Sequence, residues 1–319
     1  MEKLSSLRSK IFISIALAAI VFIALSFYGE FESIVEALKA FPWTYLLMIL
    51  GLATLNFILR FLKWDYYLSL INVDISKKES ALVFFSGLSM SITPGKFGEL
   101  LKPYLIKEYN GTSVSHSAPV VLAERFTDFV AVLILSIFGV FSFQYGVKVF
   151  AVGIVVMCLV LVTISQKQLM GKIILYTGRK IKLLSGITHK IEEAYESTYK
   201  LLRPLPLVIA TVLSLAAWFC ECYAFYLVVK GLVLKSTLFQ ATFIYAFATL
   251  VGAVSMLPGG LGATEGSMTG LLVVLFHETR HGAVAATLIV RFCTLWYAVL
   301  VGGLALIVTQ KIFSSPQGS

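Results

Sequence analysis

The sequence predicts an all-α polytopic membrane protein, with about six full transmembrane helices and two re-entrant hairpins arranged as inverted repeats. The first reason is composition: 58% of the 319 residues are hydrophobic, 13% are charged, and the mean hydropathy is +0.89. A soluble fold would leave several apolar runs of about 18 residues with nowhere to be buried. The second reason is a pair of Pro-Gly breaks within apolar sequence, at residues 94–95 and 258–260. We expect a single integral membrane domain over residues 1–319.

Six apolar runs have the length and hydropathy of membrane-spanning helices. These predicted spans cover residues 11–28, 43–62, 120–143, 147–165, 205–230 and 283–309. The first run also resembles a signal peptide, but its one cleavage-like site, at residues 24–26, is weak. We therefore predict that the first helix is retained.

Two further apolar regions are each interrupted by Pro-Gly. The paired segments are 81–93 with 97–107, and 240–257 with 263–276. Neither segment of the first pair is long enough to cross a bilayer comfortably. Freed backbone groups are tolerated at membrane depth only where they meet protein or water. We therefore predict two re-entrant hairpins whose turns face the protein interior.

Residues 166–204 form the one sizeable polar insert. Apolar and small residues recur there at helical spacing, at Ile187, Ile191, Ala194, Tyr195, Thr198 and Leu202. Charged residues occupy the positions between them. This pattern predicts an amphipathic linker helix that lies at the membrane surface or, alternatively, connects the spans through solvent.

The two broken regions belong to a predicted internal repeat. Their prolines are 164 residues apart (258 − 94), and Arg125 and Arg291 on the following long helices are 166 apart (291 − 125). The span at 43–62, moved by 164 residues, falls within the predicted helix at 205–230. Each unit is a long helix, a broken hairpin and a long helix with a buried arginine. Repeat 1 covers about 43–143 and repeat 2 about 205–309.

Loop charge predicts the orientation. The 28–42 loop is acidic, which places it outside, whereas Lys63, Lys77 and Lys78 place the 63–80 loop inside. The basic 166–204 insert and both termini then lie in the cytoplasm. With re-entrant hairpins the two repeats are inverted, which is an architecture that secondary transporters use for alternating access.

The net charge of +9 is typical of a membrane protein that meets anionic lipid headgroups, and no nucleic-acid-binding face is visible. The four cysteines lie in apolar runs and lack the spacing of a metal site or a disulfide framework. His277 and His281 are four residues apart but lack further ligands. We predict no metal and no cofactor.

Charged side chains at membrane depth face the protein interior or a hydrated cavity, because each costs at least ~2.5–3.5 kcal/mol in the bilayer centre. Arginine suits phosphate because its planar fork donates two parallel hydrogen bonds. A half-helix that begins at a Pro-Gly break also points its positive dipole end at the break. We therefore expect an anionic or zwitterionic headgroup to bind between the breaks. For Arg125 and Asp128, the alternative is an ion pair that only fixes helix packing.

The candidate site residues fall into three groups. Expected substrate-binding residues are Lys96, Lys102, Arg125, Arg291, Gly95, Gly259 and Gly260. Expected gating or coupling residues are Glu99, Glu124, Asp128 and Glu265, with Asp128 also orienting Arg125. Pro94 and Pro258 break the helices.

Four stretches carry a family resemblance: TPGKFGELLKPYL, AERFTDF, LPGGLGATEGSM and VRFCTLWYAVLVGGLAL. Together they resemble the flippase-like integral membrane family related to the membrane half of lysylphosphatidylglycerol synthases (multiple peptide resistance factor), over about residues 8–311. The resemblance implies a bacterial or archaeal inner-membrane protein that moves or helps process polar lipids. The family more commonly has Arg at the position of Lys96, and an Arg-Glu pair where this chain has Thr264-Glu265. We expect no lysyl transfer, because we expect this protein to lack the aminoacyltransferase domain of the family's bifunctional relatives.

These observations favour a lipid translocase that moves a polar phospholipid or a polyprenyl-phosphate-linked lipid between leaflets. One alternative is a membrane enzyme that processes a lipid-linked sugar or phospholipid headgroup, with Glu99, Glu124 or Asp128 as acid or base. Another is a non-transporting partner of a cell-envelope complex. The sequence is also compatible with a homo-oligomer.

Overall fold

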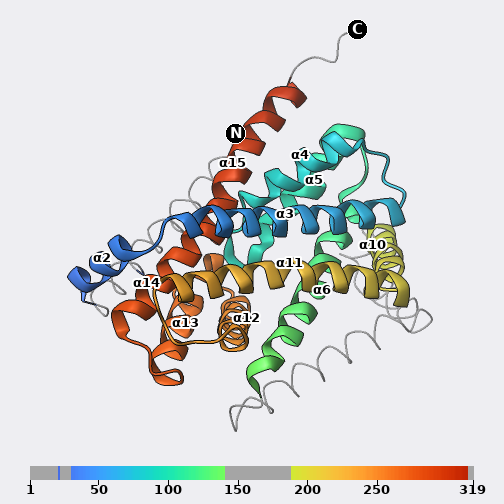
Figure 1. The fold of residues 1–319 in the computed structure, drawn as a ribbon. Helices are drawn as coiled ribbons and strands as arrows, with labels where there is room; N and C mark the ends of the chain where they lie inside the picture. Colours follow the sequence, from blue (N-terminus) through green and yellow to red (C-terminus); the bar gives the residue numbers. More distant parts are fainter. Residues whose placement is uncertain (1–20, 22–29, 141–187, 315–319) are drawn as a thin grey trace.

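A computed structural model describes residue 21, residues 30–140 and residues 188–314, and in these ranges all regular secondary structure is helical (Figure 1). Three of the described helices are long and apolar enough to cross a membrane, at Thr44–Leu70, Pro204–Gly231 and Arg280–Ile312. The predicted spans at 11–28 and 147–165 lie outside the described residues. The number of spans and the re-entrant path of the hairpins stay predictions.

The central feature is an antiparallel pair of long helices, α3 (Thr44–Leu70) and α11 (Pro204–Gly231), which Figure 1 shows side by side. At one end Gly231 packs against Tyr45, where a Cβ on the glycine would lie 3.0 Å from the ring. At the middle, Asn56 Nδ2 donates to the Ala217 carbonyl at 2.8 Å. The start of each helix therefore lies beside the end of the other.

Helix α3 continues eight residues beyond the predicted span, and this corrects the placement of Lys63. The sequence reading put Lys63 in a cytoplasmic loop, but its side chain is wholly buried on α3. Trp64 and Tyr67 are buried with it. These residues recur at helical spacing on the face toward the protein, so the helix continues into the core where a hydropathy window ends.

The chain leaves α3 and α11 by the same local structure. Asn72 and Val233 each adopt positive φ, at 56° and 57°, and are 161 residues apart (233 − 72). A capping box then starts the next helix, with the Ser76 hydroxyl accepting from the Glu79 amide, and the Thr237 hydroxyl from that of Gln240. The two units therefore share turns and caps as well as Pro-Gly breaks.

The helices that follow are packed crosswise between the units. Helix α4 (Lys77–Leu88) packs against α15 (Tyr297–Ser314), and α12 (Leu238–Val254) packs against α6 (Val114–Val140). The first arm of each broken region therefore lies on the last helix of the other unit.

The contact between α4 and α15 is close because one residue of α15 has no side chain. A Cβ on Gly302 would lie 2.1 Å from the Ser89 backbone nitrogen and 2.6 Å from the Leu88 carbonyl carbon. Gly303, on the other side of the helix, has open space around it. Gly302 is thus required for the approach of the two backbones.

The two breaks are short 3₁₀ turns that contact each other, η1 (Pro94–Leu100) and η2 (Pro258–Gly260). Helix α5 (Leu101–Asn110) follows η1, and α13 (Ala263–Val274) starts three residues after η2. The predicted helix at 97–107 thus begins later than expected. The reason is a tight turn in which the Gly98 amide donates to the Thr93 hydroxyl at 2.9 Å.

The last long helix has a different hydrogen-bonding pattern at its middle. Helix α14 (Arg280–Arg291) passes through a π-helical segment, η3 (Phe292–Trp296), into α15 without a break.

Helix α2 (Phe31–Ala40) packs against α14, although the sequence reading placed residues 28–42 in a loop. Its Ile34 is buried against Val284 and Ala285, and this apolar contact explains the helix.

The described part of the polar insert contains the predicted amphipathic helix, α10 (Thr188–Leu201), packed against α6. Its Glu193 accepts hydrogen bonds from Ser115 and Ser113 near the start of α6. The bond from Ser115, followed by that from Ser113 and the nearby His116, lowers the pKa of the Glu193 carboxyl. The linker helix is thus fastened to the first unit by polar contacts.

Candidate functional site

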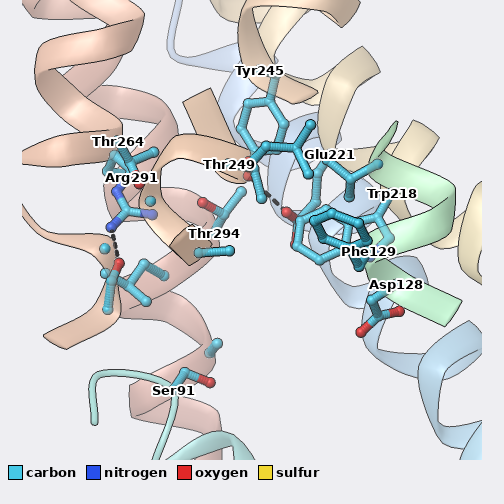
Figure 2. A pocket seen from close by; sticks show the side chains of 18 of the residues that line it. Ser91, Asp128, Phe129, Trp218, Glu221, Tyr245, Thr249, Thr264, Arg291 and Thr294 are labelled. Atoms are coloured by element: carbon cyan, nitrogen blue, oxygen red, sulfur yellow. Dashed lines mark hydrogen bonds between the residues drawn. The ribbon is translucent and has the colours of Figure 1, made fainter. Parts of the chain in front are cut away.

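A cavity of about 300 Å³ lies against the second break, and no described residue of the first 3₁₀ turn lines it. Its lining residues come from both units: Ser91 precedes the first break, and Leu257, Gly259 and Gly260 form the second. Three arginines line it, Arg60 from α3, Arg125 from α6 and Arg291 from α14. Hydroxyl groups of Ser91, Thr249, Thr264 and Thr294 and the rings of Phe129, Trp218 and Tyr245 complete much of the wall (Figure 2).

The acidic side of the first unit is organised by Lys63. Its ammonium donates to Asp128 Oδ1 at 2.6 Å and to the Ser214 hydroxyl at 2.7 Å. The Thr127 hydroxyl and the Glu124 carbonyl, both at 3.3 Å, are further acceptors. Because Lys63 has no exposed surface, its charge is compensated from within the protein.

Behind the cavity wall, Lys102 joins two carboxylates. Its ammonium lies 2.6 Å from Glu124 Oε2 and 3.5 Å from Glu99 Oε2. It also lies 4.5 Å from the centre of the Trp64 ring, where the π-face adds attraction. The side chain packs closely against Gly87, where a Cβ would lie 2.6 Å from Lys102 Cγ. Lys102 therefore holds α5 against α4 and α6 and does not line the cavity.

Arg125 connects this buried cluster to the cavity. Its Nη2 lies 3.2 Å from Glu99 Oε2 and 3.1 Å from Asp128 Oδ2. The Arg125 side chain is 23% exposed, whereas that of Glu99 is 3% exposed. The predicted orientation of Arg125 by Asp128 agrees with this distance. Asp128 itself lines the cavity, with one oxygen held by Lys63 and the other facing Arg125.

The second unit has a simpler pair. Arg291 Nε donates to Glu265 Oε1 at 2.6 Å, and its Nη2 donates to the Gly259 carbonyl at 2.7 Å. The other oxygen of Glu265 accepts from the Gly262 amide at 2.7 Å. A carboxylate of the protein therefore occupies the start of α13, where the dipole argument placed an anionic ligand.

The carboxylates of the two carboxylate–arginine pairs are separated along the chain by the same number of residues as the two arginines. Glu99 and Glu265 are 166 residues apart (265 − 99), as are Arg125 and Arg291 (291 − 125). In each unit a carboxylate at or just after the break meets an arginine of the last long helix. The shared offset favours the predicted repeat, and the arginine of each pair lines the same cavity.

The backbone of η2 and the π-segment shape the cavity on the side of the second unit. Gly259 and Gly260 adopt positive φ, at 60° and 66°, and Gly260 lies so close to Thr264 Oγ1 that a Cβ would stand 2.7 Å from it. The π-segment begins directly after Arg291 and carries Thr294 and Leu295, which line the cavity. Such segments are rare and occur often at functional sites.

A separate carboxylate, Glu221 of α11, lines the cavity beside aromatic rings. The Tyr245 hydroxyl donates to Glu221 Oε2 at 2.7 Å. In the view of Figure 2, Phe129 and Trp218 stand between Glu221 and Asp128.

Within the described residues, no group of three or more His, Cys, Asp or Glu side chains is placed to hold a metal ion.

Of the residues expected at the site, five line the cavity: Arg125, Arg291, Asp128, Gly259 and Gly260. Four others are buried behind it as ion partners: Glu99, Lys102, Glu124 and Glu265. Pro94 and Pro258 begin the two 3₁₀ turns but do not line the cavity. The surroundings of Gly95 and of the Lys96 side chain lie outside what the structure describes.

Sequence reasoning missed Arg60 and misplaced Lys63, both of which join this cluster. Arg60 lies inside the predicted span at 43–62, so a charge within an apolar run was the available signal. For Lys63 the available signal was its spacing, because it recurs with Arg60 and Tyr67 on one helical face. Glu221 is likewise a carboxylate within a predicted span.

Comparison with known proteins agrees with the membrane architecture. A UPF0104 membrane protein of Methanothermobacter thermautotrophicus is 24% identical, with 90% of each chain covered. A UPF0104 membrane protein of Pyrococcus horikoshii is 22% identical, covering 96% of this chain and 99% of its own. One from Methanocaldococcus jannaschii is 27% identical, covering 71% and 97%. A family model described as the lysylphosphatidylglycerol synthase TM region matches residues 11–302. This chain is therefore a multi-pass membrane protein that belongs to the family of the lysylphosphatidylglycerol synthase TM region.

Proposed function

We propose that the protein is a lipid translocase that moves a polar phospholipid or a polyprenyl-phosphate-linked lipid between the leaflets of the cytoplasmic membrane. The observation that carries this proposal is the cavity beside the second break, which is lined by Arg125 and Arg291 from the last long helix of each predicted repeat. The family relation makes a lipid-related membrane function plausible and thereby supports the same conclusion.

The physical task of such a protein is to replace the water that a headgroup loses in the bilayer. A charged group at the bilayer centre costs at least ~2.5–3.5 kcal/mol when nothing compensates it. The arginines and hydroxyls of the cavity offer hydrogen bonds to a headgroup, and the aromatic rings offer apolar surface to the parts of the lipid next to it. The acyl chains would stay in the membrane while the headgroup passes through.

The two carboxylate–arginine pairs suit a gating role. Glu265 and Arg291 are in direct hydrogen-bond contact at 2.6 Å, whereas Glu99 and Arg125 are 3.2 Å apart and Arg125 is more exposed. A headgroup anion that approaches either arginine competes with its carboxylate. We propose that the headgroup loosens one pair while the other stays closed, so that the two sides of the cavity open in turn. Inverted repeats would provide the two equivalent gates.

Reconstitution tests the proposal. Proteoliposomes containing a fluorescent phosphatidylglycerol are treated with a membrane-impermeant quencher, and movement of lipid from the inner leaflet is followed. We expect faster movement with the wild-type protein than with empty vesicles, and loss of the difference in Arg125→Ala and Glu99→Ala. Arg203→Ala, which changes an arginine that does not line the cavity, is the matched control. Equal lipid movement in wild-type and empty vesicles, across a panel of phospholipids, would refute the function.

The inverted arrangement has its own test. Asn110 and His277 are both exposed; Asn110 is the last residue of α5, and His277 follows α13. Single cysteines at these positions in whole cells should react with an impermeant thiol reagent only at residue 277. Reaction at both positions, or at neither, would place them on the same side and exclude inverted re-entrant hairpins.

A further inference from the structure

One wall of the cavity presents two guanidinium groups from different helices. Arg60 of α3 and Arg125 of α6 both line it, next to Asp128. Asp128 is already engaged, because Lys63 and Ser214 hold Oδ1 at 2.6 and 3.0 Å and Arg125 faces Oδ2. The carboxylate is thus largely neutralised by Lys63, and the wall keeps a positive potential.

Arg60 is the least compensated of the cavity arginines. Its side chain is 7% exposed, and the ion pair it makes, to Glu99 Oε1, spans 3.9 Å. Its buried Nε donates no hydrogen bond to any described residue, and the same holds for Nε of Arg125. Arg291, in contrast, has a carboxylate and a carbonyl at 2.6 and 2.7 Å. A buried guanidinium with an unused donor is costly unless something else accepts from it.

The charges around Arg60 show the same imbalance. The connected cluster of the first unit contains four cations and three carboxylates, for a formal sum of 4 − 3 = +1. Its members are Arg60, Lys63, Lys102 and Arg125 with Glu99, Glu124 and Asp128. In the second unit Glu265 and Arg291 cancel. Glu221 adds a further carboxylate to the cavity wall, but it accepts from Tyr245, and in Figure 2 Phe129 and Trp218 stand between it and Asp128. One bound monoanion would therefore neutralise the first cluster.

We propose that Arg60 and Arg125 together form a phosphate-binding subsite. This inference rests on the proposed function, and it names the group of the lipid that the cavity recognises. A phosphodiester carries one negative charge and exposes two oxygens, so it can bridge two guanidinium forks from different helices. Arg60, which lies outside all of the sequence motifs, then makes the cavity selective for lipids that contain a phosphate. Arg291 stays paired with Glu265.

Binding of short-chain lipids to the purified protein in detergent tests the subsite. Dioctanoyl phosphatidylglycerol is compared with dioctanoylglycerol, which has the same chains but no phosphate, and the shift of the thermal unfolding midpoint is titrated. We expect Arg60→Gln to weaken phosphatidylglycerol binding by roughly ten- to a hundredfold, because charged hydrogen bonds are lost. Arg60→Lys should recover part of the affinity, and Arg203→Gln should bind as the wild type does.

The outcomes separate this inference from the proposed function. If the wild type translocates lipid and Arg60→Gln binds phosphatidylglycerol normally, the subsite is wrong and the translocase stands. If Arg60→Gln loses binding while wild-type vesicles show no lipid movement, the subsite stands and the translocase fails. Inorganic phosphate is the third compound tested. If phosphate alone raises the thermal unfolding midpoint of the wild type but not that of Arg60→Gln, the subsite stands and its ligand is a soluble anion. Equal stabilisation by dioctanoylglycerol would overturn the phosphate requirement.

Discussion

Substitution of Lys63 gives the sharpest test of the buried charge cluster. The sequence-based placement in a loop and the buried placement in the structure predict different changes in stability. In a cytoplasmic loop, Lys63→Met would be close to neutral. In the structure, the substitution removes a fully buried cation from Asp128 at 2.6 Å. Removal of one partner from a buried ion pair typically costs ~3–5 kcal/mol. Asp128 keeps Arg125 at 3.1 Å, so we expect a value near the lower end, about 3 kcal/mol.

The assay is thermal unfolding in detergent at one scan rate. For a chain of this size about 3 kcal/mol corresponds to a decrease of about 4–5 °C in the unfolding midpoint. Lys78→Met, at an exposed lysine of α4, is the matched control and should change the midpoint by about 1 °C or less. The double variant Lys63→Met with Asp128→Asn should lose less stability than the sum of the single variants. Equal midpoints for Lys63→Met and Lys78→Met would refute the buried placement.

Three further predictions concern other contacts. Gly302→Ala should destabilise the protein by about 1–3 kcal/mol, because the added methyl group overpacks the contact with α4. Gly303→Ala, where the space is open, should be neutral or slightly stabilising. Equal thermal unfolding midpoints for the two variants would contradict the close α4–α15 contact. Arg291→Met should cost ~3–5 kcal/mol because Glu265 is left buried and unpaired, and the additional change Glu265→Gln should restore part of the loss in the same assay. Folding lowers the pKa of the Glu193 carboxyl, so this group stabilises the folded state above its unfolded pKa of about 4.3. That stabilisation is lost as the pH falls through the lower folded pKa. Glu193→Gln should therefore show a smaller decrease of the thermal unfolding midpoint below pH 5 than the wild type.

The packing of the two units explains which parts of the fold were predictable. Apolar runs predicted α3, α11 and α12 because burial in lipid requires a continuous apolar surface. The Pro-Gly pairs predicted where the helices break, since this signal acts within a few residues. The end of α3 was missed because the helix continues on an amphipathic face that packs against protein, and a hydropathy window does not distinguish that face from a loop.

The sequence by itself determined that this is a helical membrane protein, and it predicted a repeated order of elements and charged residues within the apolar regions. Each of these depends on local composition or on spacing along the chain. Only the tertiary structure decided which charges meet: Lys63 with Asp128, Lys102 with Glu124, and Arg60 with the cavity. Their partners lie on other helices, 65 and 22 residues away for the two lysines. The physical reason is that a buried charge must be neutralised in space, and the packing of α3 and α5 against α6 sets those distances.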